Sequence, residues 1–264
     1  WYDTAWAIGA VITAFLAVRY LRNSGYSTIS ALVNEMYGKK TSFIMVISMC
    51  IIQSGIIALQ YKAGGSILAA LLPDVFTTES GTFFSFLIFM LVAMIGGMGS
   101  VSLTNVLNLI LIYVGVIVAT VIVLNSHGGW DAIQTLVAAE PDVPYLSFTE
   151  GMGWIGILSW VIVMIGNTNS VQGVVQIGLT GKDDRSAKWG YIIGAAFMVP
   201  VGFICALLGV ASKALLPDAV AAEALPQILM SIPPVLGGIT LSGLWAADMG
   251  TGCSMIVGLA TTVS

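Results

Sequence analysis

One carboxylate, Asp248, lies in the stretch LSGLWAADMGTGCSMIVGLATTVS, which has no other charged residue. Small and hydroxyl-bearing residues surround it. Ala247 and Thr251 are four residues apart, so on a helix they face the same side. Hard cations such as Na⁺ prefer oxygen ligands, which a backbone carbonyl, a threonine hydroxyl and a carboxylate supply. The stretch predicts a cation site, although close packing of membrane helices also uses small residues.

A second charged residue, Lys62, lies within the apolar stretch ALQYKAGGSIL. It precedes Pro73 by about 15 Å of helix, which is close to the depth of a bilayer midplane. A charged group at that depth costs about 2.5–3.5 kcal/mol and usually pairs or lines a wet pathway. We expect Lys62 to act in this way, the alternative being that its side chain reaches up to the interface.

Polar residues interrupt a third apolar stretch, VMIGNTNSVQGVVQIG, at residues 166–170. Glycine and asparagine are poor helix formers, and asparagine and serine side chains compete for backbone hydrogen bonds. A helix that unwinds here exposes carbonyls and amides to an ion or a solute, as in secondary transporters. The alternative is a polar contact between helices.

The elements that carry these residues are membrane spans. The chain of 264 residues is 58% hydrophobic and 8% charged, whereas a soluble domain carries roughly 25% charged residues. A helix crosses a bilayer with about 20 apolar residues. We predict an all-α, polytopic membrane helix bundle with about seven spans, over residues 3–20, 41–72, 81–96, 101–124, 151–173, 189–216 and 235–264.

Basic residues orient the spans. The connections at residues 19–40 and 178–190 hold seven of the nine lysines and arginines, and alternation of the spans puts both on one side. Lysine and arginine favour the cytoplasm during insertion. We therefore predict a multi-pass protein of the cytoplasmic membrane, with the N-terminus of this chain outside and its C-terminus inside.

The composition excludes other classes of protein. The net charge is −4, and basic residues do not cluster as nucleic-acid binding requires. No nucleophile is spaced from a base as in an enzyme, and we expect no catalytic residues, no organic cofactor and no metal site beyond one for Na⁺. The partners that remain are the lipid bilayer and a small-molecule solute, and the sequence carries no signal for an oligomeric state.

Five stretches, in this order, resemble the sodium/solute symporter family of proline, pantothenate and sodium/glucose carriers. They are GYSTISALVNEMYGKK, IALQYKAGGSIL, AMIGGMGSVSLTNVLN, VVQIGLTGKDDRSAKWG and LWAADMGTGCS. The resemblance implies a LeuT-like fold of two inverted five-helix repeats. No low-complexity linker divides the chain, so we expect residues 1–264 to form one transmembrane domain. The resemblance implies that this domain is an internal fragment, in which the first broken helix and the last core helices are missing.

The resemblance also implies an ion site. Ala247 gives a carbonyl and Thr251 a hydroxyl, while the family's serine falls on Gly250, which has none. Asp248 stands where the family has an apolar residue. Its carboxylate either replaces the lost ligand or pairs with Lys62, and the pair would bind protons instead of sodium.

Solute contacts follow by position from the same resemblance. Asn167 and Thr168 fall where the family places its inner gate and solute-facing wall, and Asn169 lies in the same interruption. Gln60 and Lys62 are expected to face the same cavity.

Two functions remain. The first is cation-coupled symport, with Na⁺ or H⁺ as coupling ion, of a small polar or charged organic solute by alternating access. The second is a transmembrane solute sensor that precedes a signalling module such as a histidine kinase.

Overall fold

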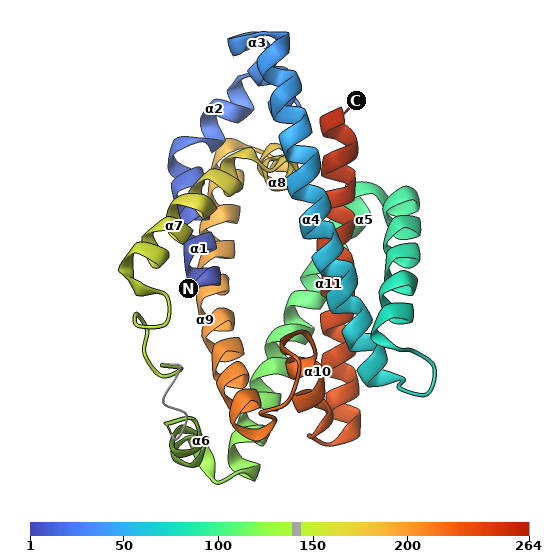
Figure 1. The fold of residues 1–264 in the computed structure, drawn as a ribbon. Helices are drawn as coiled ribbons and strands as arrows, with labels where there is room; N and C mark the ends of the chain where they lie inside the picture. The colour runs from blue at the N-terminus through green and yellow to red at the C-terminus, as the bar shows by residue number, and fades with distance from the viewer. Residues whose placement is uncertain (139–143, 264) are drawn as a thin grey trace. The chain divides into compact units, whose positions relative to one another are not determined.

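The computed structural model of the chain describes residues 1–138 and 144–263, except for the side chains of residues 97–104, 177 and 180 (Figure 1). Every regular element in this part of the chain is a helix. The all-α prediction is confirmed. The helices are α1 (Tyr2–Leu16), α2 (Val18–Asn23), α3 (Ile29–Tyr37), α4 (Lys39–Leu71), α5 (Thr78–Ser126), α6 (Gly129–Ala138), α7 (Gly153–Ser170), α8 (Gln172–Thr180), α9 (Asp184–Leu215), α10 (Ala221–Met230) and α11 (Pro234–Val263).

Four helical segments are long and apolar enough to cross a membrane. They are Lys39–Leu71, Thr78–Gly96, Asn105–Ser126 and Asp184–Leu215. They coincide with the second, third, fourth and sixth predicted spans, so the chain is a multi-pass membrane bundle.

The other three predicted spans are shorter or less apolar. Helix α1 has 15 residues, or about 22 Å, because a new helix begins at Val18. Helix α7 ends at Ser170. Helix α11 has 30 residues, but it falls outside the four segments that are apolar enough, since glycine, serine and threonine recur along it.

Contacts divide the chain into two compact units. Unit 1 comprises Trp1–Ile57, Met152–Gly202 and Ser254–Ser264, and unit 2 comprises Ala58–Gly151 and Phe203–Cys253. Helices α4, α9 and α11 contribute residues to both. That residues 1–264 form one domain stays a prediction.

Unit 2 has an apolar core between α4, α5, α6, α9, α10 and α11. Its fully buried side chains include Val116, Leu208, Leu229 and Leu241. Each buried leucine or valine contributes about 1.5–3 kcal/mol.

The first part of α5, Thr78–Gly96, runs parallel to α11. Trp245 donates a hydrogen bond from Nε1 to Ser85 Oγ at 3.2 Å. Further along both segments, the Cys253 thiol donates to the Phe89 carbonyl at 3.3 Å. Residue numbers therefore rise together along this contact.

The last part of α5, Asn105–Ser126, runs antiparallel to α11. A Cβ atom on Gly115 would meet the Thr240 side chain, and one on Gly250 would meet Asn105. Along this contact, residue numbers rise in α5 while they fall in α11. The two parts of α5 therefore run in opposite directions, as expected for two successive spans.

Unit 1 is built on a close contact between α1 and α7. A Cβ atom on Gly9 would lie 2.8 Å from the Met164 carbonyl oxygen, so only glycine allows this approach. On a further contact, Ala7 and Ala10 of α1 pack with Ala195 of α9. Small residues thus let the backbones approach, as is usual in membranes.

The contact between α4 and α5 gives a testable consequence. A Cβ atom on Gly65 would lie 2.5 Å from the Thr82 backbone nitrogen and 2.7 Å from the Thr78 carbonyl oxygen. Because backbone must shift to admit it, we expect Gly65→Ala to lower the free energy of unfolding by about 1–3 kcal/mol. The thermal midpoint in detergent measures this, with unfolding followed by labelling of the buried Cys253 thiol.

Gly55→Ala is the matched control. Gly55 lies on the same helix with nothing within 4 Å of its added Cβ. Its midpoint should equal or exceed that of the unsubstituted protein, because alanine favours helix. Equal midpoints for the two variants would contradict the described packing.

Candidate functional site

Helices α7 and α8 are two halves of one broken helix. Val171 separates them with extended backbone angles, φ −74° and ψ 115°. Its amide still donates to the Asn167 carbonyl at 2.9 Å, so the helical bonding of α7 ends there. The predicted break is confirmed, but it lies at Val171 and not within residues 166–170.

Side chains explain why the helix survives to Ser170. Asn169 donates from Nδ2 to the Ile165 carbonyl at 2.7 Å, and the Ser170 hydroxyl donates to the Gly166 carbonyl at 2.7 Å. Both bonds reach back four residues along the helix. Such bonds can bend a helix, and here they accompany an intact last turn.

Thr168 faces α1. Its side chain is 1% exposed, and its hydroxyl donates to the Met164 carbonyl at 3.1 Å. The Thr13 hydroxyl lies 3.1 Å from Thr168 Oγ1. This threonine therefore fills the contact between α1 and α7, and its predicted role in solute binding stays a prediction.

Asn167 differs from its neighbours. Its Oδ1 atom is buried and has no hydrogen-bond partner within the described part of the chain. An unpaired buried acceptor costs about 1–3 kcal/mol. Asn167 thus offers a buried oxygen that is free to accept a hydrogen bond.

The N-terminal end of α8 packs against the last turns of α11 in unit 1. A Cβ atom on Gly258 would lie 2.8 Å from the Gly173 nitrogen, and one on Gly173 would lie 3.2 Å from the Ser254 carbonyl oxygen. The two backbones are therefore in direct contact.

Three of the predicted ion ligands share one face of α11 in unit 2. The helix is unbroken through Ala247, Gly250 and Thr251, and spacings of three and four residues place them on one side. Gly250 is buried and Thr251 is exposed. The sequence-based pairing of Ala247 with Thr251 is compatible with this geometry.

Asn105 of α5 lies against this face, and sequence reasoning missed it. Its Oδ1 atom occupies the position that a Cβ atom on Gly250 would take. An amide oxygen thus stands where a serine side chain at position 250 would begin. The sequence feature that could have revealed it is the pair of polar residues 104 and 105, at the start of the fourth predicted span.

Comparison with known families decides the relationship. The model of the sodium:solute symporter family matches residues 1–264. The chain belongs to the sodium:solute symporter family. Solute symport coupled to sodium is the general activity of this family, and it is a family of transporters. A comparison with curated proteins gives no match.

Asp248 of this symporter lies on another side of α11. It lies two positions before Gly250, and this offset corresponds to a rotation of about 160° around a helix of 3.6 residues per turn. It lies instead on the side of the helix that carries Leu241 and Leu244. Leu241 belongs to the core of unit 2, and Leu244 packs against that core. The carboxylate therefore does not project to the position of the lost serine, although Thr251 lies three residues away.

Gln60 and Lys62 point to different sides of α4. The Gln60 Cβ atom lies near Gly252 of α11. Lys62, two residues further, projects to another side of the helix and is exposed. In the described part of the chain Lys62 and Asp248 form no ion pair with each other, so the hypothesis of a Lys62–Asp248 pair has no support from the geometry.

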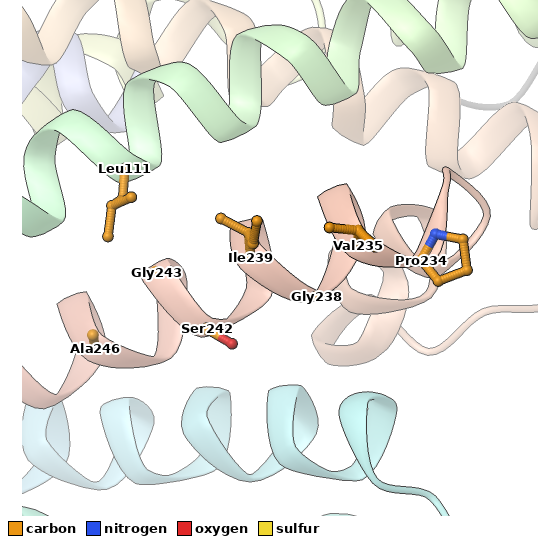
Figure 2. Close-up of a pocket in the computed structure, with 8 residues that line it drawn as sticks. All are labelled: Leu111, Pro234, Val235, Gly238, Ile239, Ser242, Gly243 and Ala246. Atoms are coloured by element: carbon orange, nitrogen blue, oxygen red, sulfur yellow. The ribbon is translucent and has the colours of Figure 1, made fainter.

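A groove of about 440 Å³ lies elsewhere in the symporter, between α11 and the second part of α5 in unit 2 (Figure 2). None of the predicted site residues lines it. Its walls are Leu111, Pro234, Val235, Gly238, Ile239, Ser242, Gly243 and Ala246. Because the lining is almost entirely apolar, this groove does not suit a cation or a polar solute.

Thr168→Val separates the packing role of Thr168 from its predicted solute-binding role. Valine keeps the shape and removes the hydroxyl. We expect a loss of about 1 kcal/mol in the free energy of unfolding, with the KM for solute unchanged. Thermal unfolding and uptake kinetics measure the two quantities.

Thr168→Ser is the control, because it keeps the hydroxyl. A higher KM for Thr168→Val at unchanged stability would instead assign Thr168 to the solute site.

Proposed function

We propose that this chain is the membrane domain of a symporter that couples Na⁺ entry to uptake of a small polar or charged organic solute. The cation binds on the face of α11 that carries Ala247, Gly250 and Thr251. Alternating access across the cytoplasmic membrane follows from the broken-helix architecture.

The observation that carries the proposal is an amide oxygen at this face. The Asn105 amide oxygen lies at Gly250, one turn from the Ala247 carbonyl and beside Thr251. Amide, carbonyl and hydroxyl oxygens are ligands that hard cations accept. Asn105 supplies the oxygen that glycine at position 250 lacks, so sodium coupling does not require Asp248 as a direct replacement.

The solute site is proposed at the break between α7 and α8. The unpaired Asn167 oxygen and the last carbonyls of α7 accept hydrogen bonds from hydroxyl or ammonium groups. Asn169 is a further candidate at this site, whereas solute binding by Gln60 and Lys62 stays a prediction.

The proposed orientation places both basic connections in the cytoplasm. Arg22 in the first contacts Gly181 and Asp184 in the second, so the two lie together within unit 1. Seven basic residues on one side agree with the preference of lysine and arginine for the cytoplasm. The N-terminus of this chain is then outside and its C-terminus inside.

The alternative is a solute sensor with the same membrane domain. Uptake of labelled solutes by the full-length protein in liposomes, under imposed ion gradients, distinguishes the two. A sensor would bind solute without accumulating it, and its full-length chain would carry a soluble signalling module.

Thr251→Ala tests the ion site. Loss of the hydroxyl ligand should raise the sodium concentration for half-maximal uptake about tenfold, which corresponds to about 1.4 kcal/mol. Thr251→Ser should restore the original value. Uptake at graded external sodium concentrations measures this.

Ser242→Ala is the control. Ser242 is an exposed hydroxyl residue on the same helix, and about 180° from Thr251 around it. If Thr251→Ala had the same sodium dependence as Ser242→Ala, the ion site would lie elsewhere.

Asp248→Asn tests the coupling ion. A carboxylate three residues from Thr251 attracts a bound cation, so we expect a several-fold weaker sodium affinity with sodium-driven uptake retained. A proton gradient alone should drive no uptake in either protein. Proton-driven uptake that is present with Asp248 and lost with asparagine would establish proton coupling instead.

A further inference from the structure

Arg22 makes four polar contacts at the corner between α8 and α9. Its Nε atom donates to Asp184 Oδ1 at 2.9 Å, and this is an ion pair. Its Nη1 atom donates to the carbonyls of Gly178, Leu179 and Gly181, at 3.0, 3.1 and 2.7 Å. The arginine side chain is 16% exposed and the Asp184 side chain 46%, so the guanidinium group is largely buried while its carboxylate partner faces water.

The contacts match the chemistry of two helix ends. The last carbonyls of α8 have no partner within their own helix and carry partial negative charge. Asp184 opens α9, where an acidic side chain is favourable. The planar guanidinium group presents five donors in a rigid fork, which suits a carboxylate together with several carbonyls.

The chain segment that follows Arg22 also contacts the beginning of α8. Gln172, which is 1% exposed, accepts a hydrogen bond from the Ile29 amide at 2.9 Å and donates to the Ser27 carbonyl at 3.0 Å. We call residues 22–29 the brace. It holds α8 by both ends, at Gln172 through Ser27 and Ile29, and at the last carbonyls through Arg22.

Two further bonds leave α8 with little freedom. Tyr191 of α9 donates its hydroxyl hydrogen to the Val174 carbonyl at 2.8 Å, and Gln176 donates from Nε2 to Thr261 Oγ1 at 2.7 Å. Since α8 begins directly after the break at Val171, the position of α8 fixes how far the helix opens there.

We propose that Arg22 is a positioning residue of the transport cycle. It holds the C-terminal end of α8 while the symporter faces outward, and its release lets the cytoplasmic side open. This rests on the proposed function and orientation. Arg22 touches neither solute nor ion, and it acts through α8.

The first test uses transport by the full-length protein in liposomes. Arg22→Gln removes the four contacts and should favour inward-facing states. The apparent affinity for external sodium then falls with the outward-facing fraction, so we expect a roughly tenfold higher half-saturating sodium concentration with a similar maximal rate per folded molecule. Arg22→Lys keeps the charge but lacks the planar set of donors. Its half-saturating sodium concentration should therefore lie between those of the unsubstituted protein and Arg22→Gln.

Arg19→Gln is the matched control, because Arg19 is an exposed arginine on the same helix, and it should behave like the unsubstituted protein. If Arg22→Gln only lowered the amount of folded protein, with the half-saturating sodium concentration unchanged, Arg22 would be a stability residue and the proposal would be overturned.

The second test does not depend on transport. Hydrogen exchange should become at least severalfold faster in Arg22→Gln at the amides of residues 176–184, and stay unchanged in the part of α5 at residues 106–126. Unchanged exchange at α8 would also overturn the proposal. Were no variant to transport any solute while exchange rose as expected, the proposed function would fail and the brace would stand.

Discussion

Backbone polar groups inside a bilayer must find partners within the protein, because lipid offers none. The break at Val171 makes this constraint acute, since a helix that stops and restarts exposes both its last carbonyls and its first amides. Elsewhere in unit 1, side chains from several helices satisfy backbone groups. Gln172 bonds backbone groups of the brace. Arg22 bonds the last carbonyls of α8, and Tyr191 bonds a carbonyl within that helix. None of the three is a predicted ion or solute ligand.

Both units bring backbones together at glycine, and unit 2 adds a core of large side chains. Unit 2 buries branched and aromatic side chains such as Leu208, Leu241 and Phe89, which are 0% exposed. The α1–α7 and α8–α11 contacts of unit 1 rely on glycine, which brings backbones together at Gly9 and Gly173. Close backbone contact gains dispersion energy without depending on the hydrophobic effect, which is weak between helices in lipid.

Sequence alone was sufficient for the fold class and for four spans, because an unbroken apolar run of about 20 residues rarely forms anything but a membrane span. It also predicted that the fifth span breaks. It could not place the break, since the back-bonding of Asn169 and Ser170 depends on rotamers. Asn105 was missed because its approach to Gly250 joins residues 145 positions apart.

Helical phase also limits which residues the sequence can group. Lys62 and Asp248 were considered together because both are charges at membrane depth, yet depth says nothing about the side of a helix on which a residue lies. Two residues of offset turn a side chain by about 160°, and this separates Lys62 from Gln60 and Asp248 from Gly250. Among these residues, only Ala247 and Thr251 have a spacing, four residues, that places them on the same side of a helix from the sequence alone.

Asn105 and Gly250 compete for one volume, and this makes the two positions epistatic. A serine at position 250 is sterically incompatible with the amide where it lies, so its arrival alone would turn Asn105 away and exchange one oxygen for another. Paired with a smaller residue at position 105, the same serine would fit without displacement. A deep mutational scan of α11 by itself would therefore misjudge which side chains this helix tolerates.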